Sequence, residues 1–292
     1  MRVPDEWLHA VCFLAIDRRD ESGTVRPEYI GTAFYMRVPN EWNPDLARLY
    51  FVTARHVIAE SRKEPGTLYI RVNTEEGGSE TVTTSKFEWT FHKDPEVDVA
   101  VLGPRFGDKG PGLLHAYIET DQCATPEVIA KEKLGIGSDL TAVGLYNRAW
   151  GDTGNAPVIR AGIIAAMPGE PLTDLYLIEM LSMGGLSGSP VFVHPVAGPQ
   201  HIHDLKRLPD GRVGSTTKWN QRSYLLGLIY GHWDERPAEP FRNLPQRDWI
   251  NQGIAIVTPV ERVLEVLHHR KFREQRRRDA ERWTRNNRPT LD

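Results

Sequence analysis

One serine in this chain lies in a glycine-flanked turn that suits a nucleophile. Residues 184–190 read Gly-Gly-Leu-Ser-Gly-Ser-Pro, and Ser187 lies between two apolar, strand-like runs. Glycine on either side lets the backbone turn sharply, approach a substrate closely and point amide hydrogens at one spot. A serine hydroxyl is weakly nucleophilic unless a base is adjacent. The turn therefore predicts catalysis only together with a base and a group that orients that base.

A histidine and an aspartate upstream could fill these two roles. His56 follows one apolar run, and Asp98 begins another. The order His56, Asp98, Ser187 is that of the chymotrypsin type of triad, whereas α/β-hydrolases run Ser, Asp, His and subtilisin-like enzymes run Asp, His, Ser. The turn also has Ser189 where a nucleophile elbow has its second glycine. Chain order therefore excludes both alternatives.

Each of these residues also has a purely structural interpretation. Ser187 alone would fit an ordinary glycine-rich hairpin, and His56 would fit a buried, hydrogen-bonded core histidine. Asp98 has two acidic neighbours, Asp94 and Glu96, and a charge before a strand is usually a solvated turn. The catalytic interpretation of these three residues therefore depends on their occurring together and in this order.

Five short blocks of sequence occur in a fixed order along the chain. They are Gly31-Thr32-Ala33-Phe34, Thr53-Ala54-Arg55-His56-Val57, Asp98-Val99-Ala100-Val101-Leu102, Gly185-Leu186-Ser187-Gly188-Ser189-Pro190 and Gly253-Ile254-Ala255-Ile256, the last followed by a helix. These blocks resemble those of trypsin-like serine peptidases of the chymotrypsin fold, and are most similar to bacterial, disulfide-free members such as the HtrA peptidase domain. The resemblance covers roughly residues 8–268.

The resemblance implies a role for each residue of the site. Ser187 would attack the scissile carbonyl, His56 would carry the proton to the leaving amine, and Asp98 would hold the imidazole. The amides of Gly185 and Ser187 would bind the oxyanion. No metal and no cofactor is implied, and the partner would be a protein or peptide substrate.

Two departures from the family concern activation and specificity. Leu186 replaces the aspartate that pairs with a newly cut N-terminus in many secreted members, so activation by that ion pair is excluded. Leu181 would lie at the base of the specificity pocket, which disfavours a basic side chain before the cut and favours an apolar one. The other substrate-binding positions implied are Tyr230, Gly231, His232, Gly253 and Ala255.

Short apolar or alternating runs predict an all-β fold of two six-stranded antiparallel barrels with a C-terminal helix. We expect an N-terminal barrel over 1–115, a second barrel over 116–258 and a basic helix and tail over 259–292. Residues 103–137 are expected to form a surface connection. The predicted strands are 10–16, 29–36, 49–53, 68–72, 86–91 and 98–102, then 140–146, 158–166, 175–180, 190–193, 224–230 and 253–257.

The C-terminal helix is predicted from Thr258-Pro259-Val260-Glu261, which reads as a capping box with proline at the first helical position. From Arg270 the sequence is strongly basic and is expected to continue as an exposed helix. Residues 261–288 carry ten basic and five acidic side chains. This surface could dock an activating or acidic partner protein, although such helices are more often solvated.

Composition limits the remaining classes of function. A net charge of -3 over 292 residues gives no general attraction to nucleic acid or to a membrane surface. Two cysteines and the lack of a signal-like apolar run favour a cytoplasmic protein. His194, His201 and His203 could bind zinc, but no accompanying ligand motif is present, so a solvated loop is favoured.

The sequence thus predicts a serine endopeptidase that works through an acyl-enzyme intermediate. The alternative from another class is a protease-fold binding or scaffold protein that acts through its basic tail and the long polar loops 195–222 and 232–250. A third hypothesis makes the chain the peptidase subunit of a larger bacterial signalling or defence system.

Overall fold

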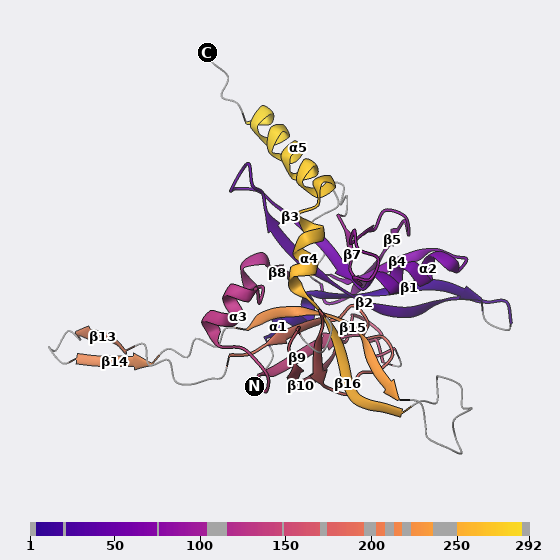
Figure 1. Cartoon of the computed structure of the whole chain (residues 1–292). Helices are drawn as coiled ribbons and strands as arrows, with labels where there is room; N and C mark the ends of the chain where they lie inside the picture. The colour runs from indigo at the N-terminus through magenta and orange to yellow at the C-terminus, as the bar shows by residue number, and fades with distance from the viewer. Residues whose placement is uncertain are drawn as a thin grey trace, which may run out of the picture.

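The computed structural model describes residues 4–19, 22–74, 76–103, 116–147, 149–169, 174–195, 203–207, 213–217, 223–235 and 250–287 (Figure 1). Among these residues no helix combines the length and the apolar character that a membrane crossing needs.

The first half of the chain forms one eight-stranded sheet. Its strands lie in the order β5-β4-β1-β2-β3-β7-β6, and β8 pairs in parallel with β2. The aromatic side chains of Phe13, Phe34 and Phe51 are fully buried in its core. The strands are β1 (Val11–Arg19), β2 (Val25–Pro39), β3 (Ala47–Thr53), β4 (Leu68–Asn73), β5 (Ser79–Thr84), β6 (Thr90–Phe91), β7 (Ala100–Leu102) and β8 (Ile118–Glu119).

The second half forms a closed six-stranded antiparallel barrel in the order β10-β11-β16-β15-β12-β9. A separate hairpin of β13 (His203–Arg207) and β14 (Val213–Thr217) makes a two-stranded sheet. The barrel strands are β9 (Asp139–Gly144), β10 (Val158–Ala166), β11 (Tyr176–Glu179), β12 (Pro190–Val193), β15 (Tyr224–Glu235) and β16 (Ile250–Pro259). The predicted chymotrypsin-like fold class is confirmed, with eight strands in the first half where six were expected.

Several local predictions differ from the structure. The run 86–91 is a strand only at β6, because residues 85–88 form a turn closed by the Glu88 amide on the Ser85 carbonyl at 3.2 Å. Strand β5 had no prediction because Val82 is its one apolar residue, so the run shows no apolar alternation. The expected surface connection 103–137 instead contains β8, a 3₁₀ turn (Thr120–Gln122) and α3 (Pro126–Glu132), while its residues 104–115 lie outside the described ranges.

The polar loops also differ from expectation. The segment 195–222 contains the β13–β14 hairpin. The segment 232–250 begins in strand β15 and ends in strand β16. The remainder of both segments lies outside the described residues. Two short helices near the N-terminus, α1 (Asp5–His9) and α2 (Arg55–Lys63), had no prediction.

The predicted helix after residue 258 is present as α4 (Val260–Leu267), but its capping box is not. Thr258 is still a residue of β16 that pairs with Leu228, so its side chain does not cap the helix, and Pro259 is the N-cap residue. The apolar stripe Val260, Val263 and Leu267 is buried. Helix α4 contacts β7 of the first sheet and β15 of the barrel, and so bridges the two halves.

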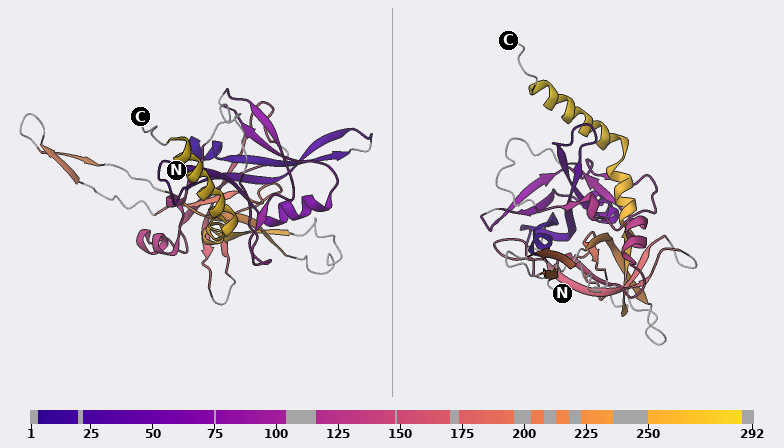
Figure 2. Two further views of the ribbon diagram at one scale, coloured as in Figure 1. Left: turned by 90° about the horizontal axis from the view of Figure 1, so that it is seen from above. Right: turned by 90° about the vertical axis from the view of Figure 1, so that its left-hand side faces the viewer.

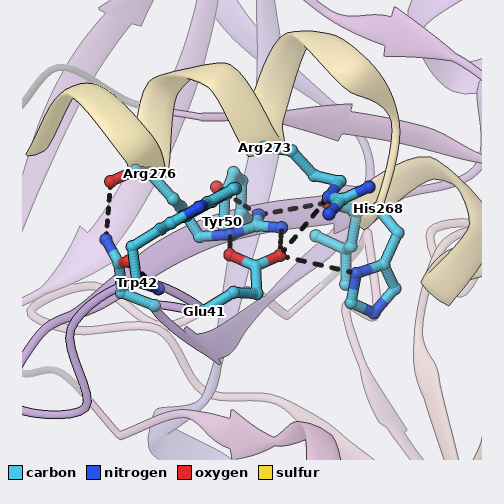
Figure 3. A network of polar contacts seen from close by, with 8 residues as sticks. Glu41, Trp42, Tyr50, His268, Arg273 and Arg276 are labelled. Carbon is cyan, nitrogen blue, oxygen red and sulfur yellow. Dashed lines mark hydrogen bonds and ion pairs between the residues drawn. The ribbon is translucent and has the colours of Figure 1, made fainter. Parts of the chain in front are cut away.

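The basic segment continues as α5 (Arg270–Asn286), but the expectation of an exposed helix is wrong for one of its faces. Phe272, Arg276 and Ala280 are buried against the first sheet, as the close-up in Figure 3 illustrates for Arg276. The helix then runs outward from the body of the protein (Figure 2). Docking of a partner on its outward face stays a prediction.

A buried arginine holds α5 in place. Arg276 is 0% exposed, and its guanidinium donates to both Glu41 carboxylate oxygens at 2.6 and 2.8 Å, to the Tyr50 hydroxyl at 2.8 Å and to the Leu267 carbonyl at 3.1 Å (Figure 3). The Arg276 carbonyl accepts from the Asn40 side chain at 2.6 Å. These contacts satisfy a charge that would otherwise be costly to bury. Hydrogen bonding to Arg276 lowers the pKa of the Glu41 carboxyl.

Replacement of Arg276 by methionine is expected to destabilise the protein by about 2 kcal/mol, because Glu41 loses both short hydrogen bonds and keeps only its longer contacts with His268 and Arg273 and some access to water. Urea unfolding at pH 7 measures this difference. The depressed pKa of Glu41 means that the contribution is present above its ordinary value near 4.5 and is lost as pH falls through the lower folded value. Arg277→Met, on the exposed face, is the control and should unfold like wild type.

Candidate active site

A two-point contact joins His56 to Asp98. His56 lies in the first turn of α2, and Asp98 precedes β7. The Asp98 Oδ2 atom lies 2.7 Å from the imidazole Nδ1, and its Oδ1 accepts the backbone amide of His56 at 2.7 Å. Asp98 is buried, while the His56 side chain is 38% exposed. A proton on Nδ1 that faces the carboxylate leaves Nε2 as the acceptor, which is the tautomer a general base needs.

The neighbouring acids do not compete for the imidazole. Asp94 uses its Oδ1 to accept the backbone amide of Glu96 at 3.0 Å, and both residues are exposed. His56 is neither a core histidine nor paired with them. Asp98 is thus the carboxylate that lies against the ring, and its catalytic role stays a prediction.

The Ser187 turn is hydrogen-bonded to strand β15 of the barrel. The Gly188 amide donates to the Ile229 carbonyl at 2.8 Å, and the Ile229 amide donates to the Ser189 carbonyl at 2.9 Å. Within the turn the Ser189 amide donates to the Leu186 carbonyl at 2.9 Å. Leu186 is fully buried, so an apolar side chain fills this position. The turn is therefore fixed on both sides of Ser187.

Gly188 brings this turn against the segment that carries the histidine. Its φ is +84°, and a Cβ there would overlap the Thr32 carbonyl and the Thr53 hydroxyl and lie 3.0 Å from the Ala54 nitrogen. Ala54 is the N-cap of α2, two residues before His56. Only glycine permits both the left-handed backbone and this close approach. The Ser187 turn and the start of α2, which carries His56, are thus in direct contact.

Thr32 on β2 ties the two halves of the site together. Its amide donates to the Ser187 carbonyl at 2.9 Å, and its hydroxyl donates to the Gly185 carbonyl at 2.8 Å and accepts the Leu145 amide at 2.8 Å. Its own carbonyl accepts the Thr53 hydroxyl at 2.6 Å. Thr32 belonged to a family-like block, yet no sequence signal indicated that it positions the nucleophile turn.

Replacement of Thr32 by valine is expected to lower kcat by about tenfold and stability by about 2 kcal/mol, since a buried amide and a turn carbonyl lose their partner. The readouts are peptide hydrolysis and urea unfolding. Thr32→Ser retains the hydroxyl and is expected to restore kcat. A valine variant with the kcat of wild type would show that the hydroxyl does not position the turn.

Two amides of the turn are free to bind an anion. The Leu186 amide closes the turn on the Met183 carbonyl at 3.2 Å, and Gly185 has a φ of +100°. A positive φ at this third position is typical of a type II turn. Within the described residues, neither the Gly185 nor the Ser187 amide donates to a protein acceptor. The two amides expected to stabilise an oxyanion are therefore unpaired.

Among the substrate-binding candidates, Tyr230 places its ring against that of His56. Its ring centroid is 6.0 Å from that of His56 at an interplanar angle of 84°, and the residue is 40% exposed. It lies at a bulge of β15, because Ile229 pairs with Val257 while Gly231 pairs with Ile256. Bulges often redirect a side chain next to an active site.

The other predicted specificity residues lie in and around β15 and β16. Ala255 is buried opposite His232, whose side chain lies outside the described residues. Gly253 has a φ of +76°, and its carbonyl accepts the Met180 amide at 2.7 Å. Leu181 is 51% exposed, and its place at the base of a specificity pocket stays a prediction.

Of the three histidines considered for zinc, the structure describes the side chain of His194. His194 directly follows strand β12 and is buried, so the solvated loop expected at this position is wrong. Its Nε2 lies 2.7 Å from the Thr141 hydroxyl and its Nδ1 lies 2.9 Å from the Ser223 hydroxyl, and burial lowers its pKa. His201 and the side chain of His203 lie outside the described residues. Over the described part of the chain, no group of three metal-ligating side chains occurs.

Comparison with solved structures finds many chains of similar fold, and a crystal structure of Deg5 is one of them. The Deg5 structure matches 89% of this chain and 88% of its own, with 13% sequence identity and a TM-score of 0.47. No family model and no curated protein matches the sequence.

Proposed function

We propose that this protein is a serine endopeptidase in which Ser187 attacks the peptide carbonyl and His56 transfers the proton. Asp98 holds the imidazole and stabilises it when it becomes charged. The amides of Gly185 and Ser187 stabilise the oxyanion, and the acyl-enzyme is then hydrolysed by water. The reaction needs no cofactor in this mechanism.

The observation that carries this proposal is the contact between the two halves of the site. The His56–Asp98 pair belongs to the half of the chain that forms the first sheet, and the Ser187 turn precedes strand β12 of the barrel. Gly188 packs against Ala54 at the start of α2, and Thr32 donates to the carbonyls of Gly185 and Ser187. A serine in an unrelated hairpin would not require this packing.

Covalent labelling tests the proposal directly. A fluorophosphonate phosphonylates a serine hydroxyl that is activated by a base, with loss of fluoride. Mass spectrometry of the labelled protein is expected to locate the adduct on Ser187. A protein that stays unlabelled at pH 8, or that carries its adduct elsewhere, would favour a protease-fold binding protein.

A further inference from the structure

A second histidine lies at the start of the turn that carries Asp98. His92 directly follows β6, and its side chain is 3% exposed. Its Nδ1 lies 3.1 Å from the backbone amide nitrogen of Asp94, and its Nε2 lies 2.7 Å from Oε2 of Glu265 on α4. A backbone amide can only donate, so Nδ1 accepts, and Nε2 carries the proton that the carboxylate accepts. His92 is therefore a neutral, buried imidazole with both ring nitrogens hydrogen-bonded.

The amide that donates to His92 begins the turn on which Asp98 lies. The Asp94 carbonyl accepts the Val97 amide at 3.3 Å, and the Val97 carbonyl accepts the Val99 amide at 3.0 Å. The second of these bonds closes a three-residue turn with Asp98 at its centre. The Val99 carbonyl in turn accepts the His92 amide at 3.2 Å, which closes the whole segment on itself. The orientation of Asp98 thus depends on how Asp94 is held.

The other contacts of Asp94 fix it less firmly. Its Oδ1 accepts the Glu96 amide at 3.0 Å, which is a bond within the turn itself. Its carbonyl lies 3.4 Å from Nη1 of Arg55, at the long limit of a hydrogen bond. Both acidic residues are exposed. Over the described part of the chain, the buried ring of His92 is therefore the side chain that ties the first residue of this turn to the core.

We infer that His92 is a positioning residue for the His56–Asp98 pair. By accepting the Asp94 amide, its ring holds the turn that directs Asp98 toward His56. The Asp98 carboxylate reaches both the Nδ1 atom and the backbone amide of His56 at 2.7 Å, so a small displacement of the turn weakens both contacts. The role of this pair in catalysis rests on the proposed function, whereas the position of Asp98 can be measured without turnover.

The second contact of the ring serves a different purpose. Glu265 lies on α4, outside the turn, and also accepts from Arg262 at 2.8 Å. Its bond to His92 tethers the ring to the helix that bridges the two halves of the protein. We therefore expect the Glu265 contact to contribute to stability and the Asp94 contact to position Asp98.

Two variants of His92 separate these contacts. Asparagine places an oxygen where the ring has Nδ1, and glutamine places an amide nitrogen where the ring has Nε2. His92→Gln is expected to lower kcat about tenfold with an unchanged KM, because Asp98 moves and no substrate contact is removed. His92→Asn is expected to hold kcat within about twofold of wild type. Both variants should melt at a lower temperature than wild type, since each loses one contact of a buried ring.

Hydrogen exchange of the proton on the His56 Nδ1 atom is a readout that needs no turnover. ¹⁵N NMR follows this proton, which the hydrogen bond to Asp98 protects from solvent. Its exchange rate is expected to rise about tenfold in His92→Gln and to stay within about twofold of wild type in His92→Asn. Glu265→Ala keeps the Asp94 contact and is the control. It should lower the melting temperature and leave both the exchange rate and kcat as in wild type.

Asp94→Ala loosens the same turn from an exposed position, so its test does not depend on the folding of a variant with a changed core. It removes the acceptor of the Glu96 amide and should raise the exchange rate of the His56 proton about threefold. An exchange rate unchanged from wild type in this variant and in His92→Gln would overturn the inference.

Two further results would also overturn it: equal losses of kcat in His92→Asn and His92→Gln, or a loss in Glu265→Ala as large as that in His92→Gln. Failure of the proposed function is seen separately. Wild-type protein that a fluorophosphonate leaves unlabelled would lose the catalytic assignment, whereas the change in exchange at His56 would still show that His92 positions Asp98.

Discussion

Replacement of Ser187 by alanine is expected to lower peptide hydrolysis by about 10⁴- to 10⁶-fold, the usual loss when the nucleophile of such a triad is removed. No other hydroxyl can take over, because the turn is fixed by Gly188 and by hydrogen bonds to β15. The measurement is cleavage of a fluorogenic peptide by matched amounts of each protein. Fluorophosphonate labelling should disappear in the same variant.

The matched control is Ser189→Ala, two residues further along the chain. Ser189 is fully buried, and its hydroxyl has no hydrogen-bond partner among the described residues. Removing it should leave the rate and the labelling close to those of wild type. If the two alanine variants lost activity equally, the loss would reflect damage to the turn, and the assignment of Ser187 as nucleophile would fail.

The sequence predicted the fold class, and it supplied the three residues of the candidate site, whose role as a triad stays a prediction, because both leave local signals. Alternating apolar runs mark the strands, and the order of His56, Asp98 and Ser187 marks the type of site. The contact of Asp98 with His56 followed from its place at the head of a strand. These features depend on residues that are close in the chain or on their order.

The features that the sequence did not predict depend on contacts between distant residues. The Thr32 hydroxyl donates to the Gly185 carbonyl of the Ser187 turn, 153 positions later in the sequence. The residues that flank Thr32 in the sequence do not indicate this role. Arg276 belongs to a run of arginines that predicts a solvated face. It is nevertheless buried, and it donates to Glu41 and Tyr50, which are more than two hundred positions away in the sequence. The predicted capping box of α4 is absent because Thr258 belongs to strand β16, where it pairs with Leu228.

Replacement of Asp98 by asparagine is expected to lower kcat/KM by about 10⁴-fold while leaving the fold intact, by analogy with the loss known for the aspartate of the chymotrypsin-type triad. The two-point contact explains why so conservative a change is harmful. The backbone amide of His56 needs an oxygen at the Oδ1 position, 2.7 Å away, so the asparagine carbonyl will occupy it.

The asparagine NH₂ group must then face the imidazole Nδ1, which can only accept its hydrogen bond. That tautomer carries its proton on Nε2 and cannot take the proton of Ser187. NMR of the ¹⁵N-labelled imidazole is expected to find the proton on Nδ1 in wild type and on Nε2 in the variant, with unchanged urea unfolding within about 1 kcal/mol. An Asp98→Asn protein with the wild-type rate would mean that His56 does not depend on Asp98 for its tautomer, and the general-base role derived from this pair would have to be abandoned.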